Sequence, residues 1–334
     1  MPSYLPTQKT SSQEGVGMAT DYILFIHGVT IREDHPEQPV YADPLFKRLQ
    51  ESPDSRQLVL KKVPLYWGDV NEKAEDKLRK QFQASPLWND MWFRTFREQQ
   101  ILEFTGDAAL YISRHVGSQV ANTLRTQAVD HLKNANSHER LHLVTHSWGT
   151  VILFDILFAG RWDYEDYTED KKKDLPGYED VKAIREVIFG IGSNPNHGVK
   201  IASIHTMGSP VAIFNLTNVQ IGKDSGNSPS GFDITPNLQK LLESLQKVRN
   251  GKKLPWRNYI HPGDPIAYPL NELMTDLVDG DKQYLDIQDI LTQEAGLLDC
   301  VTAQTLLPIL QGGDAHGSYW QNEKVVQEIN RVLK

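Results

Sequence analysis

The sequence predicts an α/β fold in three layers, with helices covering both faces of a mostly parallel central sheet. Short, mainly apolar runs at 22–26 (YILFI) and 141–145 (LHLVT) alternate along the chain with segments of helical periodicity. Runs of this kind are typical of strands covered on both faces. Alternating strands and helices favour parallel pairing through right-handed crossovers. With 334 residues, 39% of them hydrophobic, the chain is long enough for one large domain of this type.

The elements are expected in a regular order. A long helix is predicted over 107–134 because Leu110, Val116, Val120 and Leu124 recur at helical spacing. The remaining predicted strands are 58–66, 201–206 and 257–260, and the remaining predicted helices are 44–50, 148–159, 238–248 and 319–333.

Residues 1–20 are polar and are predicted to form a flexible N-terminal tail, with residues 21–334 forming a single domain. Segments at about 67–105, 161–198 and 217–255 are rich in charged and aromatic residues or in Gly and Ser, and we expect them to be helical cap insertions.

Composition excludes several classes of function. The net charge is 35 − 43 = −8, which argues against a nucleic-acid partner. The single cysteine, Cys300, excludes a disulfide framework and a multi-cysteine metal site, and its apolar surroundings predict a buried thiol. The apolar run at 151–159 is too short to span a bilayer, and the first residues do not form a secretory signal. We therefore expect a cytoplasmic protein without integral membrane association; the sequence does not indicate its oligomeric state.

One short sequence motif, centred on Ser147, indicates a chemical function. The strand at 141–145 runs directly into His146, Ser147, Trp148 and Gly149, and then into an apolar helix. A serine on such a sharp strand-to-helix turn has its hydroxyl exposed above the carboxyl edge of the sheet. The N-terminus of the following helix favours negative charge beside that hydroxyl.

This pattern resembles the nucleophile elbow of the α/β-hydrolase superfamily, in its lipase- and esterase-like branch. Thr145 stands where the family's Gly-x-Ser-x-Gly motif has its first glycine. The resemblance covers 22–158 and 201–319 in patches, including 204–210 (IHTMGSP), and none of the insertions. It implies the α/β-hydrolase fold and a nucleophile, acid and histidine in that chain order.

The resemblance also implies the other catalytic residues. His316 lies in a Gly-rich loop (GGDAHGSYW) before the last helix, where the family carries its catalytic histidine, and His261 is the alternative base. Asp264 follows the strand at 257–260 and resembles the family's acid, although a turn aspartate can also simply bond its own backbone. Asp281, Asp286 and Asp299 lie in helix-like or polar connecting sequence, and Asp314 is too near His316 to be the acid.

Acyl transfer also needs donors for the oxyanion. We expect the backbone N–H of Trp148 to be one and, by resemblance to lipases, that of Val29 to be the second, with Gly28 allowing close approach of the substrate. His146 and Gly149 complete the elbow. His27, His146 and His205 lie in strand or elbow positions that suit structural roles.

The sequence thus predicts a serine hydrolase that cleaves small-molecule or lipid carboxylic esters through an acyl-enzyme, without a metal or cofactor. Two alternatives remain open: a lipase or phospholipase that acts on membrane lipids, and a non-catalytic binding protein on the same fold. Aromatic residues between Phe82 and Phe104 could line an acyl pocket or form the core of a cap helix.

Overall fold

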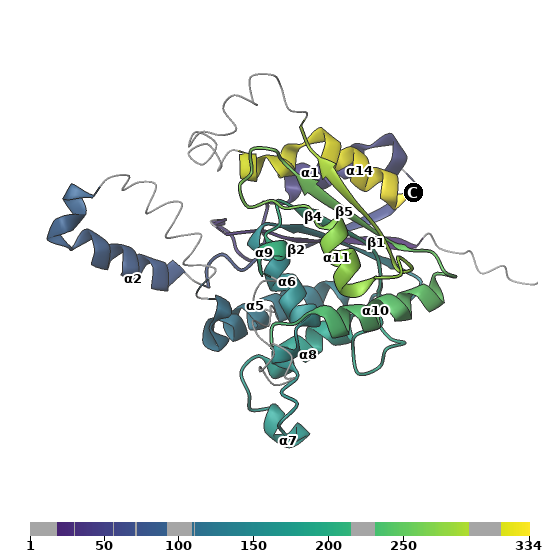
Figure 1. The fold of residues 1–334 in the computed structure, drawn as a ribbon, viewed down its shortest axis with the longest axis horizontal. Coiled ribbons are helices and arrows are strands. Elements are labelled where there is room, and N and C mark those ends of the chain that lie inside the picture. The colour runs from purple at the N-terminus through teal and green to yellow at the C-terminus, as the bar shows by residue number, and fades with distance from the viewer. Residues whose placement is uncertain are drawn as a thin grey trace, which may run out of the picture.

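The computed structural model of the chain describes residues 19–29, 31–55, 57–70, 72–91, 109, 111–214, 231–293 and 315–334 (Figure 1). Several predictions fall outside the described residues: residues 1–18 of the tail predicted at 1–20, parts of the insertions predicted at 67–105 and 217–255, Cys300, Asp299 and Asp314. Thr20, predicted as the end of the tail, is the first residue of β1.

A sheet of six parallel strands, in the order β2-β1-β3-β4-β5-β6, forms the centre of the structure. The strand order reverses at β1, because the chain first adds β2 on one side and then crosses to add β3 on the other. In open parallel sheets the crevice for ligands lies at such a reversal, at the carboxyl ends of the strands. The strands are β1 (Thr20–Ile26), β2 (Val59–Leu65), β3 (Arg140–His146), β4 (Lys200–Met207), β5 (Leu254–Ile260) and β6 (Leu285–Leu291).

Helices cover both faces of the sheet (Figure 1). Alternate residues of β1 enter two separate cores: Ile23 and Phe25 pack with α1 (Asp43–Glu51) and α14 (Glu323–Leu333), whereas Leu24 and Ile26 pack in the larger core on the opposite face. The predicted three-layer α/β arrangement is therefore confirmed. The helices of the larger core are α5 (Arg114–Leu132), α6 (Trp148–Phe158), α8 (Tyr178–Glu186), α10 (Thr235–Val248) and α11 (Asn271–Val278).

Most predicted elements lie close to their expected bounds, but the long helix predicted over 107–134 is interrupted at Ser113; residues 107, 108 and 110 lie outside the described residues. α5 begins at Arg114 because the Ser113 side chain accepts a hydrogen bond from the Val116 N–H and caps the first turn. The predicted C-terminal helix is divided. A short 3₁₀ helix, η6 (Ser318–Gln321), precedes α14, and the side chain of Asn322 caps the start of α14.

The sequence analysis missed β6 and wrongly placed Asp286 in connecting sequence. β6 is an edge strand in which Leu285 and Ile287 are buried while the other positions are more exposed. Asp286 lies within this strand and forms an ion pair with Arg257 of β5. The apolar signal of an edge strand is weak because only one face of the strand is covered.

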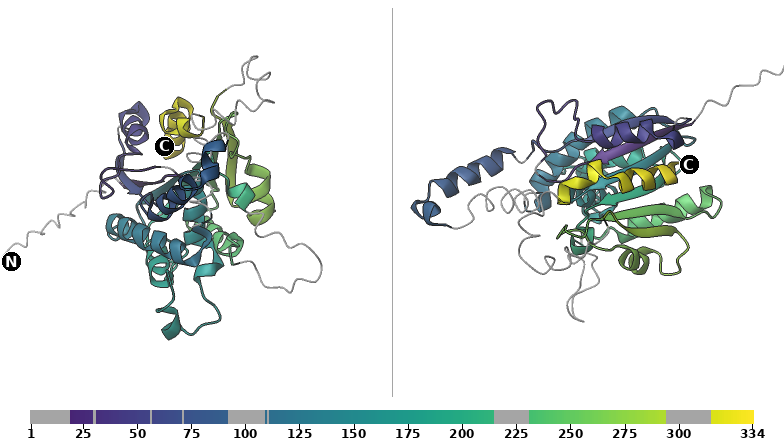
Figure 2. Two further views of the ribbon diagram at one scale, coloured as in Figure 1. Left: turned by 90° about the vertical axis from the view of Figure 1, so that its left-hand side faces the viewer. Right: turned by 90° about the horizontal axis from the view of Figure 1, so that it is seen from above.

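The segments predicted as insertions lie in different places. α2 (Glu72–Gln83) and the 3₁₀ helix η2 (Pro86–Asp90) extend away from the sheet (Figures 1 and 2). In contrast, α8 packs on α5 and α6, and the leucines of α10 belong to the larger core. Short elements complete the described chain: η1 (Pro53–Ser55), η4 (Gly160–Trp162), α7 (Glu169–Lys172) and α9 (Val211–Phe214). The assignment of the segments at 67–105, 161–198 and 217–255 to a cap stays a prediction.

Within the described ranges, none of the helices combines the length and apolarity that crossing a bilayer requires.

Candidate active site

The loops that leave the carboxyl ends of the strands bring the predicted residues to one edge of the sheet. Gly28 and Val29 follow β1, Ser147 follows β3, and Asp264 follows β5. His316 lies in a short helical segment directly before η6, not in the predicted loop, and reaches the same edge by a hydrogen bond to Asp264. This edge includes the reversal of strand order between β1 and β3.

Ser147 has a backbone conformation that L-residues rarely adopt, with φ 54° and ψ −133°. Such a conformation costs about 1–3 kcal/mol and persists only where the surroundings hold it. The Ser147 N–H donates to the Met207 carbonyl at the end of β4 at 2.9 Å, and the Ser147 carbonyl accepts from the Thr150 N–H in the first turn of α6. The sharp turn between strand and helix therefore matches the geometry that exposes a nucleophilic hydroxyl.

Thr145 fits in the place where the family has a glycine. Its side chain is buried, and its hydroxyl lies 2.8 Å from that of Thr150 on the first turn of α6. The hydroxyl also donates to the His205 carbonyl at 3.4 Å. A β-branched residue is accommodated at this position because its polar atom is paired with the helix that follows.

Two glycines allow the β1 loop and the elbow to meet. A Cβ atom added to Gly28 would lie 2.5 Å from the Ser147 Cβ and 3.0 Å from its Oγ. A Cβ atom added to Gly149 would lie 2.2 Å from the His27 carbonyl oxygen. Both positions therefore require the absence of a side chain, and the peptide between Gly28 and Val29 lies directly beside the serine.

A hydrogen bond joins Asp264 and His316, the two residues that the resemblance implied as acid and base. His316 Nδ1 lies 2.8 Å from Asp264 Oδ2, and the Tyr319 hydroxyl donates to the same oxygen at 2.8 Å. The other carboxylate oxygen accepts from the Ile266 N–H. Burial raises the pKa of Asp264, but the hydrogen bond and charge of His316, followed by the bond from Tyr319, outweigh burial and hold that pKa below its usual value.

The carboxylate determines the tautomer of His316. Because an ionised carboxylate only accepts hydrogen bonds, Nδ1 of His316 donates to Asp264, and in the neutral ring Nε2 would present a lone pair. That Nε2 atom and the Oγ of Ser147 are both buried, and neither makes a hydrogen bond with a described residue. The edge of the sheet therefore holds a basic nitrogen and a hydroxyl that are both available to a reacting group.

His146 joins the turn at Ser147 to the segment that carries His316. Its Nε2 donates to the main-chain carbonyl of His316 at 2.7 Å, and the two rings lie 4.6 Å apart. Burial, followed by the proximity of His316, lowers the pKa of His146 to about 3, so this ring is neutral near pH 7. His146 thus has a structural contact with the site, which the motif itself did not predict.

The alternative base is engaged elsewhere. His261 Nε2 is paired with the Gln293 side chain at 2.9 Å, and its Nδ1 accepts from the Gly263 N–H at 3.0 Å. The structure therefore brings Asp264 to His316 and not to His261.

Sequence reasoning missed Tyr319 as a partner of the acid. Its hydroxyl donates to Asp264 and also accepts from the His261 N–H at 2.8 Å, so it ties together two loops of the site. Burial, followed by the charge of Asp264, raises the pKa of Tyr319, which keeps the hydroxyl a donor. Its position three residues after His316 in the sequence is the one signal that could have indicated it.

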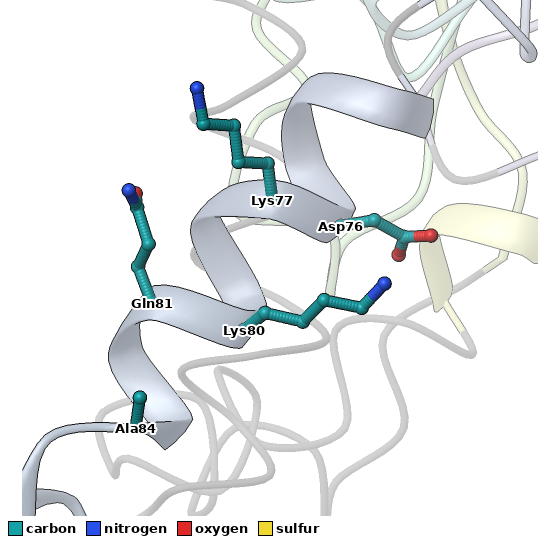
Figure 3. Close-up of a pocket in the computed structure, with 5 residues that line it drawn as sticks. All are labelled: Asp76, Lys77, Lys80, Gln81 and Ala84. Carbon is teal, nitrogen blue, oxygen red and sulfur yellow. The ribbon is translucent and has the colours of Figure 1, made fainter.

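A hollow of about 520 Å³ lies along one face of α2 and does not include the predicted site residues (Figure 3). It is lined by Asp76, Lys77, Lys80, Gln81 and Ala84. No group of three or more His, Cys, Asp or Glu side chains within the described part of the chain is placed to hold a metal ion.

No protein-family model matches the chain, and no curated protein matches it. Among solved structures, the chain is similar to Est1E from Butyrivibrio proteoclasticus, with 8% sequence identity and a TM-score of 0.35, over 96% of this chain and 91% of that chain. A similarity at this level assigns neither family nor activity, and the chemistry of the site is argued from the chain's own geometry.

Proposed function

We propose that the protein is a serine hydrolase of the α/β-hydrolase type that cleaves carboxylic esters through an acyl-enzyme. The hydrogen bond between Asp264 and His316 is the observation that carries the proposal, because it orients the imidazole and leaves its Nε2 atom unpaired at the edge that holds Ser147. A serine hydroxyl is a weak nucleophile and needs such a base, itself oriented by a third group.

The reaction proceeds in two halves, acylation of Ser147 and hydrolysis of the acyl-enzyme. Ser147 Oγ forms a bond to the ester carbonyl carbon while its proton passes to His316 Nε2. The resulting imidazolium is stabilised by the Asp264 carboxylate, and the backbone N–H groups of Val29 and Trp148 bind the oxyanion. His316 then gives the proton to the alcohol oxygen as the bond between that oxygen and the carbonyl carbon breaks, which leaves the acyl-enzyme. In the second half a water molecule attacks the acyl carbon while its proton passes to His316 Nε2, and the bond to Ser147 Oγ breaks as His316 returns the proton to that oxygen, which releases the acid.

The first step requires Ser147 Oγ to come within hydrogen-bond reach of His316 Nε2, since no such bond is present without substrate. Hydrogen bonds of this kind are often long in unliganded enzymes and shorten when the substrate binds. The strained backbone of Ser147 and the hydrogen bond between His146 and the His316 carbonyl both limit how far the two groups can move apart.

Replacing the nucleophile tests the proposal. Ser147→Ala is expected to abolish hydrolysis of p-nitrophenyl esters and covalent labelling by a fluorophosphonate probe. Ser118→Ala, on α5, serves as the control and should retain both. Wild-type protein that takes up no label would favour a non-catalytic binding protein, and full activity of Ser147→Ala would remove this serine from the mechanism.

The length of the acyl chain that the enzyme prefers is tested separately. Comparing short soluble esters with long-chain esters in vesicles distinguishes a soluble-ester hydrolase from a lipase or phospholipase that acts on membrane lipids. Preference for short soluble esters is expected from the proposal, while a rate that rises sharply at a lipid surface would favour the lipase alternative.

A further inference from the structure

The peptide between Gly28 and Val29 is held by the side chain of the residue before it. His27 Nδ1 lies 2.6 Å from the Gly28 carbonyl oxygen. A trans peptide group is planar, and its C=O and N–H point in opposite directions. A hydrogen bond that fixes the Gly28 carbonyl therefore also fixes the direction of the Val29 N–H.

The partners of the His27 ring determine which nitrogen carries its proton. Nε2 accepts from the backbone N–H of Trp67 at 3.2 Å, so the proton of the neutral ring is on Nδ1, which donates to the Gly28 carbonyl. Burial lowers the pKa of His27 to about 3, so this tautomer is kept throughout the neutral range.

The ring is also fixed in place. His27 is fully buried, and it stacks on the Trp67 indole with a centroid distance of 5.4 Å and an interplanar angle of 1°. The edge of Tyr41 packs against it at 4.9 Å. In addition, the Trp67 indole N–H donates to the His27 carbonyl at 3.0 Å, so that one residue of the loop after β2 holds both the ring and the backbone of His27.

The Gly28 end of this peptide lies against Ser147. Gly28 lies so close to Ser147 that an added Cβ would meet its Cβ and Oγ. No described residue accepts a hydrogen bond from the Val29 N–H. This N–H is therefore unpaired among the described residues, and its direction is set by a buried histidine that holds the carbonyl of the same peptide.

We propose that His27 is a positioning residue, which aims the Val29 N–H at the oxygen of the reacting carbonyl by holding the Gly28 carbonyl. The inference rests on the proposed hydrolase function. The hydrogen bond has a second effect, because donation to a peptide carbonyl polarises the peptide and strengthens its N–H as a donor. His27 thus acts on the transition state through the peptide, without touching the substrate.

Two isosteric amides separate the contributions of the two ring nitrogens. His27→Asn places an amide nitrogen near the position of Nδ1 and can still donate to the Gly28 carbonyl. His27→Gln places its amide near Nε2, where it can still accept from the Trp67 N–H but not hold the Gly28 carbonyl. Both variants keep one buried hydrogen bond, so they are a matched pair for folding.

We expect His27→Gln to lower kcat for a p-nitrophenyl ester about tenfold to a hundredfold with little change in KM, since the loss of one oxyanion donor costs about 10²–10³ in rate. His27→Asn should retain kcat within about fivefold of wild type. Binding of an alkyl boronic acid, whose adduct with a serine places an oxygen where the oxyanion forms, should weaken in parallel with kcat. Thermal unfolding of both variants is measured alongside.

The outcomes separate the two proposals. Wild-type protein without turnover and without phosphonate labelling overturns the hydrolase function itself. If the wild-type protein is active, three results would each overturn the role of His27 alone. These are an equal loss of kcat in the two variants, a change in KM alone in His27→Gln, and unchanged binding of the boronic acid. If both variants unfold, His27→Phe, which keeps the ring stacked on Trp67 but lacks the donor, replaces them, and unchanged kcat in that variant overturns the inference.

Discussion

The Nε2 atom of His146 donates a hydrogen bond to the main-chain carbonyl of His316 at 2.7 Å. This contact joins His146, the residue before Ser147, to the segment that carries the proposed base His316, although the two residues are 170 positions apart in the chain. The relative position of nucleophile and base thus depends on a bond that neither of them makes with its own side chain.

Removing this bond should affect catalysis more than folding. His146→Phe keeps a ring beside His316 but leaves the His316 carbonyl without its donor, and we expect kcat to fall about tenfold, which corresponds to about 1.4 kcal/mol. His146→Gln, which can donate from nearly the same position, should lose less. Steady-state kinetics check the rates, and equal losses in the two variants would show that the hydrogen bond is not responsible.

The acid can be tested without changing its shape. Asp264→Asn removes the negative charge and disturbs the tautomer of His316, and we expect kcat to fall about 10⁴-fold, as in other enzymes where the acid of such a triad is replaced by its amide. Tyr319→Phe removes one donor to Asp264 while the bond to His316 remains, so its loss should be much smaller. Single-turnover acylation rates provide the comparison, and a larger loss in Tyr319→Phe would contradict the assigned order.

The space between Gly28 and Ser147 should not tolerate a methyl group. Gly28→Ala would place a carbon 2.5 Å from the Ser147 Cβ, and we expect the resulting shift of the β1 loop to lower kcat at least about a hundredfold by displacing an oxyanion donor. Gly317→Ala is the matched control, because an added Cβ there meets no atom within 4 Å. Retained activity in Gly28→Ala would mean that the loop does not need its present approach to the serine.

Stability should fall on the acid side of neutrality. Burial lowers the pKa values of His27 and His146 to about 3, and those of His142 and His205 are lowered as well. The unfolded chain, with histidine pKa values near 6.5, therefore binds more protons between pH 6.5 and about 3, so the free energy of unfolding decreases as the pH drops through this range.

Urea unfolding at pH 7.5, 6.0 and 5.0 measures this decrease. His27→Asn should reduce its slope, because one buried titrating group is removed. A free energy of unfolding that does not change with pH in this interval would contradict the neutral, buried state of these rings.

Asp155 supports the helix that follows the nucleophile. Its buried Oδ2 accepts hydrogen bonds from Arg161 at 2.7 Å, Trp162 at 3.0 Å and Tyr111 at 2.5 Å. Asp155→Ala would leave the Arg161 guanidinium buried without its anion, and we expect a loss of about 3–5 kcal/mol in the free energy of unfolding. Asp130→Ala, which breaks an exposed pair with Lys133, should change it by less than about 1 kcal/mol. Denaturant unfolding of the two variants checks this difference.

Local sequence was sufficient for much of the fold. The run at 22–26 and the apolar helix after Ser147 have strong patterns, because both are covered on all sides by the core. The edge strand β6 and the division of the C-terminal helix at Asn322 were not predicted, since an edge strand buries only one face and a cap depends on the exact backbone conformation.

By itself, the sequence determined which residue types could do chemistry: a serine at a turn between strand and helix, a histidine in a glycine-rich loop and an aspartate after a strand. Only the tertiary structure decided which of them meet. The bonds of His316 to Asp264, of His146 to the His316 carbonyl and of His27 to the Gly28 carbonyl depend on how loops from separate strands close over one edge of the sheet. Hydrogen bonds require placement to within a few tenths of an ångström, and such placement arises from packing across the whole domain and not from local preference.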